Sequence, residues 1–321
     1  MKKMAGAFIA IWIFLIATPV SAVTQRMLVP VGRVIGLELR DDTVTVAAFA
    51  DGAYGAKVAG LQIGDRLLRI DGCDIHCAED VLKAMEQGRE QVQLVVLRDG
   101  KEKAINLTPM HTPEGRRLGI YLRQGVTGIG TVTFYDPETM TFGALGHGVN
   151  DGKGALLQMR SGSVYDANVV SVKKGCPGQP GQLRGAVTAR AALGRLEKNT
   201  ARGVFGHMDL PEAKDAIPVA EAGTVKTGHA VIRSTVQGNS VREYSVEILR
   251  IYADKRADGR NFLLRVTDPA LLEATGGIVQ GMSGSPIIQH GKLVGAITHV
   301  LVNDPTTGYG IFIENMLDAA A

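Results

Sequence analysis

The sequence has 321 residues, of which 45% are hydrophobic and 5% aromatic, and its formal net charge at pH 7 is +3. This length suggests two folded domains, and the 40 glycines predict many tight turns, which favours a mainly β or an α+β protein. Because the charge is small and forms no basic run or stripe, nothing supports nucleic-acid binding.

The first 22 residues have the pattern of an export segment. Lys2 and Lys3 precede an apolar run from Met4 to Val20, and Val20-Ser21-Ala22 has the small residues of a signal-peptidase site. A run of about 17 apolar residues is also near the lower limit for crossing a bilayer. We therefore expect residues 1–22 to be a cleaved signal peptide or a retained membrane anchor, with the rest of the chain outside the cytoplasm.

Residues 29–108 have the turn, strand and helix signals of a small α+β domain. Gly60 to Gly72 predicts a turn, a strand and an Asp-Gly turn. Ala78 to Gln87 has apolar residues at helical spacing, and Asp99-Gly100 is a hairpin turn between two further strands.

The string G-L-Q-I-G-D-R-L-L-R-I-D-G at Gly60 to Gly72 resembles a PDZ domain of the bacterial protease type. Such a domain binds a peptide as an added strand beside a helix, and backbone N–H groups of a preceding loop hold the peptide's end. The resemblance implies that Val34-Ile35-Gly36-Leu37 is that loop and that the helix with Val81 and Met85 is the other wall.

Three cysteines, Cys73, Cys77 and Cys176, are an odd number for an exported protein, so at least one is unpaired within the chain. Cys73-Asp74-Ile75-His76-Cys77 offers three potential metal ligands without an obvious fourth. We expect buried or half-buried thiols, no metal site and no cofactor.

Residues 115–321 are predicted to form a second, mainly β domain. Gly128 to Tyr135 and Thr141 to Leu145 predict a hairpin that ends at Gly146-His147-Gly148. Pro and Gly clusters separate the strands expected after it, which are Val169 to Val172, Gly203 to Phe205, His229 to Val236, Val241 to Ala253 and Phe262 to Val266. A short helix is possible around Ala186 to Lys198, and the whole fits a double β-barrel.

The most informative loop is Gly281-Met282-Ser283-Gly284-Ser285-Pro286. Small residues let the backbone turn tightly, so that the N–H groups of Gly281 and Ser283 can form an oxyanion hole beside the Ser283 hydroxyl. The next residues, Ile287 to Ile297, predict two strands joined by a Gly turn, as in a β-barrel protease. An α/β-hydrolase elbow is disfavoured because a helix should follow its serine.

A serine hydroxyl needs a base within hydrogen-bond reach and a third group that orients the base. Among seven histidines we prefer His147, because it ends a hairpin in the half of the domain that lacks the nucleophile. Asp268 is the predicted third member because it lies between His147 and Ser283 in the chain, although much nearer the serine. Asp151 and Asp166 remain alternatives.

Four strings carry a resemblance over nearly the whole chain, namely G-A-L-G-H-G at 143–148, T-D-P at 267–269, T-G-G-I-V-Q-G-M-S-G-S-P at 275–286 and T-H-V-L-V-N-D-P at 298–305. With the order PDZ then protease, the chain resembles the stage IV B sporulation peptidase family, SpoIVB. The resemblance implies a serine endopeptidase with the triad His147, Asp268 and Ser283.

The resemblance also implies partners and a location. Proteins of that family enter the space between the forespore and mother-cell membranes, cleave themselves, and cut a membrane-bound regulator to release a sigma-factor-processing protease. For this chain it implies such a protein substrate, a peptide ligand for the PDZ domain, and membrane contact through the N-terminal segment.

The string Gly308-Tyr309-Gly310 resembles the closing strand of HtrA-type proteases. Together with Thr298-His299-Val300 it is expected to line the specificity pocket. Met282 stands where trypsin-like zymogens keep an Asp that pairs with a freed amino terminus, so activation by that ion pair is not expected.

The predicted fold class is therefore mainly β with a small α+β module: an export or anchor helix, a PDZ domain and a chymotrypsin-like double β-barrel. The alternative function is a non-catalytic PDZ adaptor whose barrel is a binding scaffold. A metal hydrolase is not expected, because the sequence has no H-E-x-x-H or comparable cluster.

Overall fold

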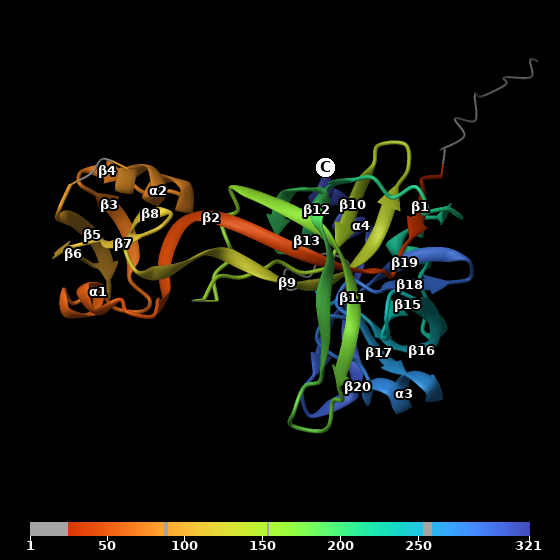
Figure 1. Ribbon diagram of the computed structural model, residues 1–321. Coiled ribbons are helices and arrows are strands. Elements are labelled where there is room, and N and C mark those ends of the chain that lie inside the picture. The colour runs from red at the N-terminus through yellow and green to blue at the C-terminus, as the bar shows by residue number, and fades with distance from the viewer. Residues whose placement is uncertain (1–24, 87–88, 153, 253–258) are drawn as a thin grey trace, which may run out of the picture.

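The computed structural model describes residues 25–86, 89–152, 154–252 and 259–321. The expected signal or anchor segment, residues 1–22, lies outside the described residues. Within the described ranges, no helix is both long and apolar enough to cross a membrane. The chain is mainly β, with two barrels and a smaller module that projects to the left in Figure 1.

Six antiparallel strands form the first barrel, and the pairing of β2 with β9, such as Gly36 with Ile129, closes it. In ring order the strands are β2 (Val34–Phe49), β9 (Ile120–Asp136), β10 (Thr141–Ala144), β13 (Gly203–Met208), β12 (Gln182–Thr200) and β11 (Ser161–Lys173). Two short strands, β1 (Met27–Pro30) and β14 (Ile217–Pro218), continue the sheet beyond β9. Alternate residues of a strand share a face, so Ile35, Leu37 and Leu39 of β2 are all buried in the same core.

The second barrel also has six strands and is closed by the pairing of β15 with β18. In ring order they are β15 (Gly228–Thr235), β16 (Val241–Ile251), β17 (Phe262–Val266), β20 (Asp304–Phe312), β19 (Lys292–Leu301) and β18 (Pro286–Gln289). Helix α3 (Pro269–Thr275) follows β17, and helix α4 (Ile313–Ala320) ends the chain. The 3-10 turn η1 (Ala222–Thr224) precedes β15.

A cluster of buried apolar side chains joins the two barrels. Phe134 and Phe205 of the first barrel pack with Ile311 of the second and with Ile313 and Met316 of α4. Residues 130–136 of β9 are all buried, because this segment packs both in the core of the first barrel and against the second barrel. Many antiparallel strands instead have one exposed face. Strand β9 therefore lies directly against the second barrel, where it contacts the loop that contains Ser283.

The smaller module lies at the far end of a long ribbon formed by β2 and β9, and its remaining elements come between these two strands in the chain (Figure 1). Its own core includes Val46, Leu67, Ile70 and Leu94. Its elements are α1 (Tyr54–Val58), β3 (Arg66–Ile70), β4 (Cys73–Asp74), α2 (Ala78–Glu86), β5 (Val92–Arg98), β6 (Lys101–Leu107), β7 (Met110–Thr112) and β8 (Gly115–Arg117).

This arrangement corrects the expected domain boundaries of 29–108 and 115–321. Val29 pairs with Tyr135, and residues 34–39 of β2 pair with β9 and β11, so these segments are part of the first barrel. The module is thus an insertion into that barrel, not a domain that precedes it. The sequence suggested otherwise because the two strands that enclose the insertion lie far apart in the chain.

The expected peptide-end loop, Val34-Ile35-Gly36-Leu37, is also corrected. These residues are in the middle of the first barrel, where β9 and β11 flank β2 on its two sides. Their main chain is used by the sheet, so it cannot hold the end of a peptide.

The short helix expected at Ala186 to Lys198 is wrong, because these residues are in β12. Alanine, arginine and leucine favour helices locally, but the pairing of β12 with β11 and β13 is a tertiary effect that overrides propensity.

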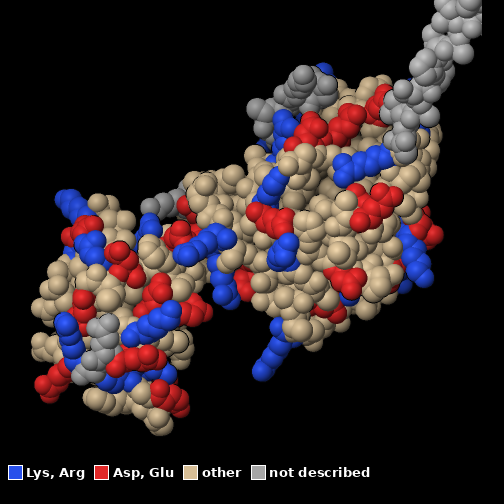
Figure 2. All heavy atoms as spheres, turned by 90° about the horizontal axis from the view of Figure 1, so that it is seen from above, with Lys and Arg blue, Asp and Glu red and all other residues tan. Residues whose placement is uncertain are grey.

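The face of the molecule in Figure 2 carries Lys and Arg side chains interspersed with Asp and Glu, over both the module and the barrels. Neither positive nor negative charge dominates this face. Cys73 and Cys176 are exposed, while Cys77 is half-buried. The expectation of buried or half-buried thiols is therefore wrong for Cys73 and Cys176.

Candidate active site

Ser283 lies in a tight loop between α3 and β18, at the contact between the two barrels. Gly281 and Gly284 have φ values of 98° and 97°, which a residue with a Cβ rarely adopts. At Gly284 a Cβ would lie 2.1 Å from the carbonyl oxygen of Thr131 on β9. The glycines therefore allow the loop to turn sharply while its backbone rests directly on the first barrel.

His147 follows β10 in the first barrel, after Leu145 and Gly146, which both have φ of 69°. Its Nδ1 lies 2.9 Å from the Gly148 carbonyl oxygen. A carbonyl can only accept a hydrogen bond, so Nδ1 carries the proton and the Nε2 lone pair is free. Burial lowers the pKa of His147, and the bond to Gly148 opposes this only in part. The neutral imidazole, which can act as a base, is thus favoured.

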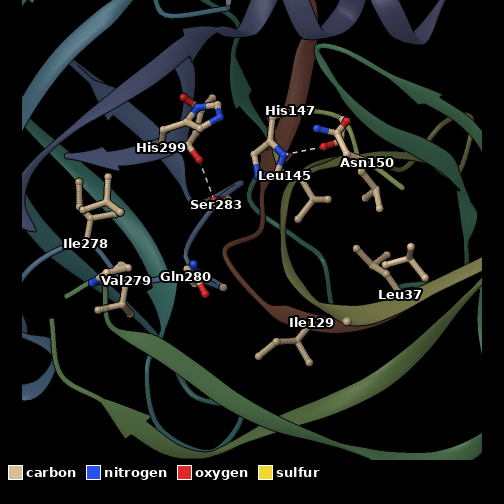
Figure 3. A pocket seen from close by; sticks show the side chains of 18 of the residues that line it. Leu37, Ile129, Leu145, His147, Asn150, Ile278, Val279, Gln280, Ser283 and His299 are labelled. Atoms are coloured by element: carbon tan, nitrogen blue, oxygen red, sulfur yellow. Dashed lines mark hydrogen bonds between the residues drawn. The ribbon is translucent and has the colours of Figure 1, made fainter. Parts of the chain in front are cut away.

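Both side chains line one cavity of about 810 Å³ between the barrels (Figure 3). The Ser283 hydroxyl donates to the Thr298 carbonyl oxygen at 2.7 Å and makes no hydrogen bond to His147. The ring of His299 lies 5.2 Å from the ring of His147, between centroids. Proton transfer from Ser283 to His147 would therefore require the hydroxyl to turn from Thr298 towards the imidazole, and catalytic hydrogen bonds commonly form only once substrate is bound.

The predicted oxyanion residues are on the same wall. Gly281 and Ser283 both line the cavity, and neither N–H has a hydrogen-bond acceptor among the described residues. Unpaired donors beside a serine hydroxyl are the feature that stabilises a tetrahedral oxyanion.

The structure does not bring Asp268 to His147. One carboxylate oxygen of Asp268 accepts from the Leu271 N–H at 3.1 Å, and the other accepts from the Ser245 N–H at 3.3 Å. Asp268 is the N-cap of α3, followed by Pro269 at the first helical position. The Asp-Pro pair that suggested a triad member is a helix-start signature.

Asp166 and Asp151, the alternative candidates for the third triad member, are hydrogen-bonded to groups other than His147. Asp166 lies between Arg33 and the Thr188 hydroxyl. Burial would raise the pKa of Asp166, but hydrogen bonds from Thr188 and Arg33 lower it below its ordinary value. Asp151 accepts from the Ala155 N–H at 3.0 Å.

The specificity pocket differs in part from its prediction. Thr298-His299-Val300 line the cavity, whereas Gly308-Tyr309-Gly310 form the adjacent strand β20 behind them. A Cβ at Gly308 would lie 2.5 Å from Ile278 Cδ1, so this glycine makes room for an apolar side chain of the lining.

Several lining residues were missed by the sequence analysis. They are mostly apolar and come from distant segments: Leu37, Leu39, Val126, Ile129, Leu145, Val149, Leu156, Ile278, Val279 and Val302. Asn150, on the side of His147 in Figure 3, is a polar member that the neighbouring G-H-G string could have indicated. Among the described lining residues none is Asp, Glu, Lys or Arg, so the cavity suits apolar side chains.

A second, smaller groove of about 210 Å³ lies in the module. Val81 and Met85 of α2, the residues of the predicted helical wall, line it, and Leu82 of the same helix is exposed beside them. The opposite wall is the segment from Arg117 to Leu122, which leads into β9. The predicted wall, Val34 to Leu37, has no part in it.

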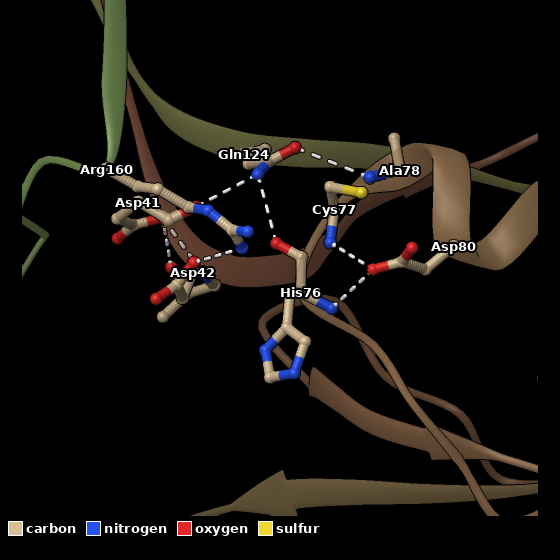
Figure 4. A network of polar contacts seen from close by, with 9 residues as sticks. Asp41, Asp42, His76, Cys77, Ala78, Asp80, Gln124 and Arg160 are labelled. Atoms are coloured by element: carbon tan, nitrogen blue, oxygen red, sulfur yellow. Dashed lines mark hydrogen bonds and ion pairs between the residues drawn. The ribbon is translucent and has the colours of Figure 1, made fainter.

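Gln124 of β9 connects the module to the barrel (Figure 4). Its amide nitrogen donates to the carbonyl oxygens of Asp41 at 2.9 Å and His76 at 3.1 Å, and its amide oxygen accepts from the Ala78 N–H at 3.4 Å. Gln124 thus joins the ribbon to the start of α2.

Two solved structures show a weak similarity to this chain. The active form of the Rv3671c protease from M. tuberculosis is 16% identical, with a TM-score of 0.35 over 75% of this chain and 84% of that one. The inactive form of the Rv3671c protease is 14% identical, with a TM-score of 0.33 over 60% and 82%. The family model described as SpoIVB peptidase S55 matches residues 114–317, more than half of the chain. The chain is a serine peptidase and belongs to the SpoIVB peptidase S55 family.

Proposed function

We propose that this serine peptidase is an endopeptidase in which Ser283 is the nucleophile and His147 is the base. The observation that supports this is the cavity between the barrels, whose lining includes Ser283, His147 and the two unpaired N–H groups of Gly281 and Ser283. No carboxylate contacts His147 in the described structure, so the Gly148 carbonyl is the group that fixes its tautomer.

The reaction follows from these groups. His147 Nε2 takes the proton of the Ser283 hydroxyl as its oxygen attacks the carbonyl carbon of the scissile peptide. The N–H groups of Gly281 and Ser283 stabilise the resulting oxyanion. The imidazolium gives its proton to the leaving amine, the carbon–nitrogen bond breaks, and water, deprotonated by His147, then hydrolyses the acyl-enzyme.

The apolar lining of the cavity supports a substrate with apolar residues beside the scissile bond. Family membership supports the further proposal that the protein is exported, acts in sporulation, cleaves itself and cuts a membrane-bound regulator of a sigma-factor-processing protease. Mass spectrometry of the mature amino terminus, compared between the wild type and Ser283→Ala, tests self-cleavage and retention of the anchor together.

The catalytic assignment is tested with a fluorophosphonate probe, which labels activated serines. Labelling should occur at Ser283 and be lost in Ser283→Ala and in His147→Ala. Ser285→Ala is the matched control, because Ser285 is two residues away and donates to the Ser234 hydroxyl at 3.0 Å. Continued labelling of folded Ser283→Ala would overturn the assignment, and no labelling of the folded wild type would favour an adaptor.

We also propose that the module is a PDZ-type domain that binds an apolar carboxy-terminal peptide in its groove. The segment Ile120 to Leu122 pairs on one side with β2 only, so a peptide strand can add on the other side, beside α2. At the groove's end, the N–H groups of Leu118 and Gly119 have no acceptor among the described residues. These donors suit a terminal carboxylate.

Fluorescence anisotropy with peptides ending in an apolar residue tests this site. Leu82→Glu should weaken binding by at least about tenfold, since it places a charge on the apolar wall. Lys83→Glu, at the neighbouring exposed position, should leave binding unchanged. Equal binding of amidated peptides would contradict a carboxylate site.

A further inference from the structure

Two threonines of β9 hold the nucleophile loop from the opposite barrel. Thr131 and Thr133 are both completely buried. The Thr131 hydroxyl donates to the Gly281 carbonyl oxygen at 2.7 Å, and the Thr133 hydroxyl donates to the Gly284 carbonyl oxygen at 2.7 Å. The Thr131 N–H also donates to the Ser283 carbonyl oxygen at 3.2 Å. Three carbonyl groups of the loop are therefore directed towards β9.

The orientation of the oxyanion donors depends on the peptide planes next to them. In a trans peptide the N–H points opposite to the carbonyl of the same plane. The Gly281 N–H is paired in this way with the Gln280 carbonyl, which accepts from Leu183 at 2.8 Å. The Ser283 N–H is paired with the Met282 carbonyl, which accepts from Ser285 at 3.0 Å.

The plane between these two, from Gly281 to Met282, is held at its carbonyl by the Thr131 hydroxyl and at its N–H by the Val279 carbonyl oxygen at 3.1 Å, so Thr131 is its one side-chain anchor among the described residues. Glycine tolerates many backbone conformations, so Gly281 by itself does not prevent this plane from rotating. Met282 is apolar and fully buried, so it supplies no charge that could fix the loop through an ion pair. The Thr131 hydroxyl is thus the side-chain group that secures the middle plane of the oxyanion hole.

We propose that Thr131 is a positioning residue for catalysis, which keeps the N–H groups of Gly281 and Ser283 directed at the oxyanion, and that Thr133 plays a lesser part by fixing Gly284. This inference rests on the proposed roles of Ser283 and the oxyanion hole. Thr131 touches no reacting atom and acts only through the backbone of the loop.

The test compares Thr131→Val, which keeps the shape and removes the hydroxyl, with Thr131→Ser, which retains the donor. Loss of an oxyanion donor costs roughly 100- to 1000-fold in rate, so a misaligned one should cost about 10- to 100-fold. We expect Thr131→Val to lower kcat on casein and the rate of fluorophosphonate labelling by that factor with KM nearly unchanged. Thr131→Ser should remain within about threefold of the wild type.

Thr127→Val is the matched control, since Thr127 is an exposed residue of the same strand. If Thr131→Val does not fold, Thr131→Ala, which also removes the hydroxyl, provides the same comparison. A folded Thr131→Val or Thr131→Ala with wild-type kcat would overturn the inference. Ser283→Ala separates the two proposals, because labelling that survives this change rejects the nucleophile itself, whatever Thr131 does.

Discussion

His147 and Ser283 each make a hydrogen bond to a nearby carbonyl group in the resting site, and the two bonds have opposite effects. The bond from His147 Nδ1 to Gly148 leaves Nε2 free to accept a proton. The bond from Ser283 to Thr298 directs the hydroxyl proton away from that base. In the proposed mechanism the base is therefore ready to accept a proton, whereas the serine hydroxyl must rotate first.

The direction of the His147 pKa shift predicts the pH dependence of activity. Burial disfavours the charged imidazolium, so the pKa lies below its ordinary value of about 6.5. Because only the neutral imidazole can take the serine proton, the enzyme should stay active below that pH and lose activity only at still lower pH. The acid limb of kcat/KM against pH measures this, and a midpoint above about 7 would contradict it.

Helix α3 illustrates how an element can determine the role of a residue. Asp268 has the chain order of a triad acid, but its two carboxylate oxygens bind the N–H groups of Leu271 and Ser245. The first bond caps α3 and the second ties the start of the helix to β16. The carboxylate therefore stabilises the second barrel.

Substitutions of Asp268 distinguish a cap from a catalytic acid. Asn caps a helix about as well as Asp, whereas Ala loses about 1 kcal/mol. We expect Asp268→Ala to lower the free energy of unfolding by about that amount and Asp268→Asn to lower it less. Both should label with fluorophosphonate at near wild-type rates. A loss of about 10⁴-fold in kcat for Asp268→Asn would instead show that it orients the base.

Elements with local signals could be predicted from the sequence. The β5–β6 hairpin has Asp99-Gly100, with φ of 51° and 75°, and α2 has its apolar residues at helical spacing. Strands β18 and β19 were likewise indicated by their Gly turn. Strand β12 was missed because its pairing with β11 and β13 is not encoded in its own residues.

In the candidate site, too, the features with local sequence signals could be predicted and those that depend on long-range contacts could not. The serine loop and His147 follow from short glycine-rich strings that force a particular backbone. The contact of Thr131 with Gly281 joins residues 150 positions apart, and so it could not be predicted from either string. The cavity lining from β2, including Leu37, required the closure of the first barrel to be known.

Across the whole molecule, β9 is a continuous strand that reaches from the module to the nucleophile loop. Its first residues, Ile120 to Leu122, border the groove beside α2, and Thr131 contacts Gly281 at the other end. Between them, Gly125 has φ of 72° and a Cβ there would lie 1.8 Å from the Leu39 carbonyl oxygen, so this position of the ribbon requires glycine. This is the point where the barrel part of the ribbon passes into the module part.

The junction contains two kinds of polar contact with unequal expected strength. Arg160 and Asp42 form an ion pair at 2.8 Å, but their side chains are 60% and 56% exposed, so solvent screens the pair. The amide of Gln124 bonds three backbone groups, and its bonds with Asp41 and Ala78 are part-buried while the one to His76 is exposed. Gln124 should therefore contribute more than the ion pair to the attachment of α2.

Gln124→Ala tests this attachment. Loss of its hydrogen bonds to Asp41, His76 and Ala78 should destabilise the module by about 1–3 kcal/mol, because backbone groups lose their partners. Since the module has a core of its own, we expect faster amide exchange in α2 while exchange in β16 and β17 is unchanged. Gln93→Ala, at an exposed position of β5, is the control. Equal acceleration in the second barrel would mean that module and barrels unfold as one unit, and an unchanged α2 would mean that Gln124 does not hold it.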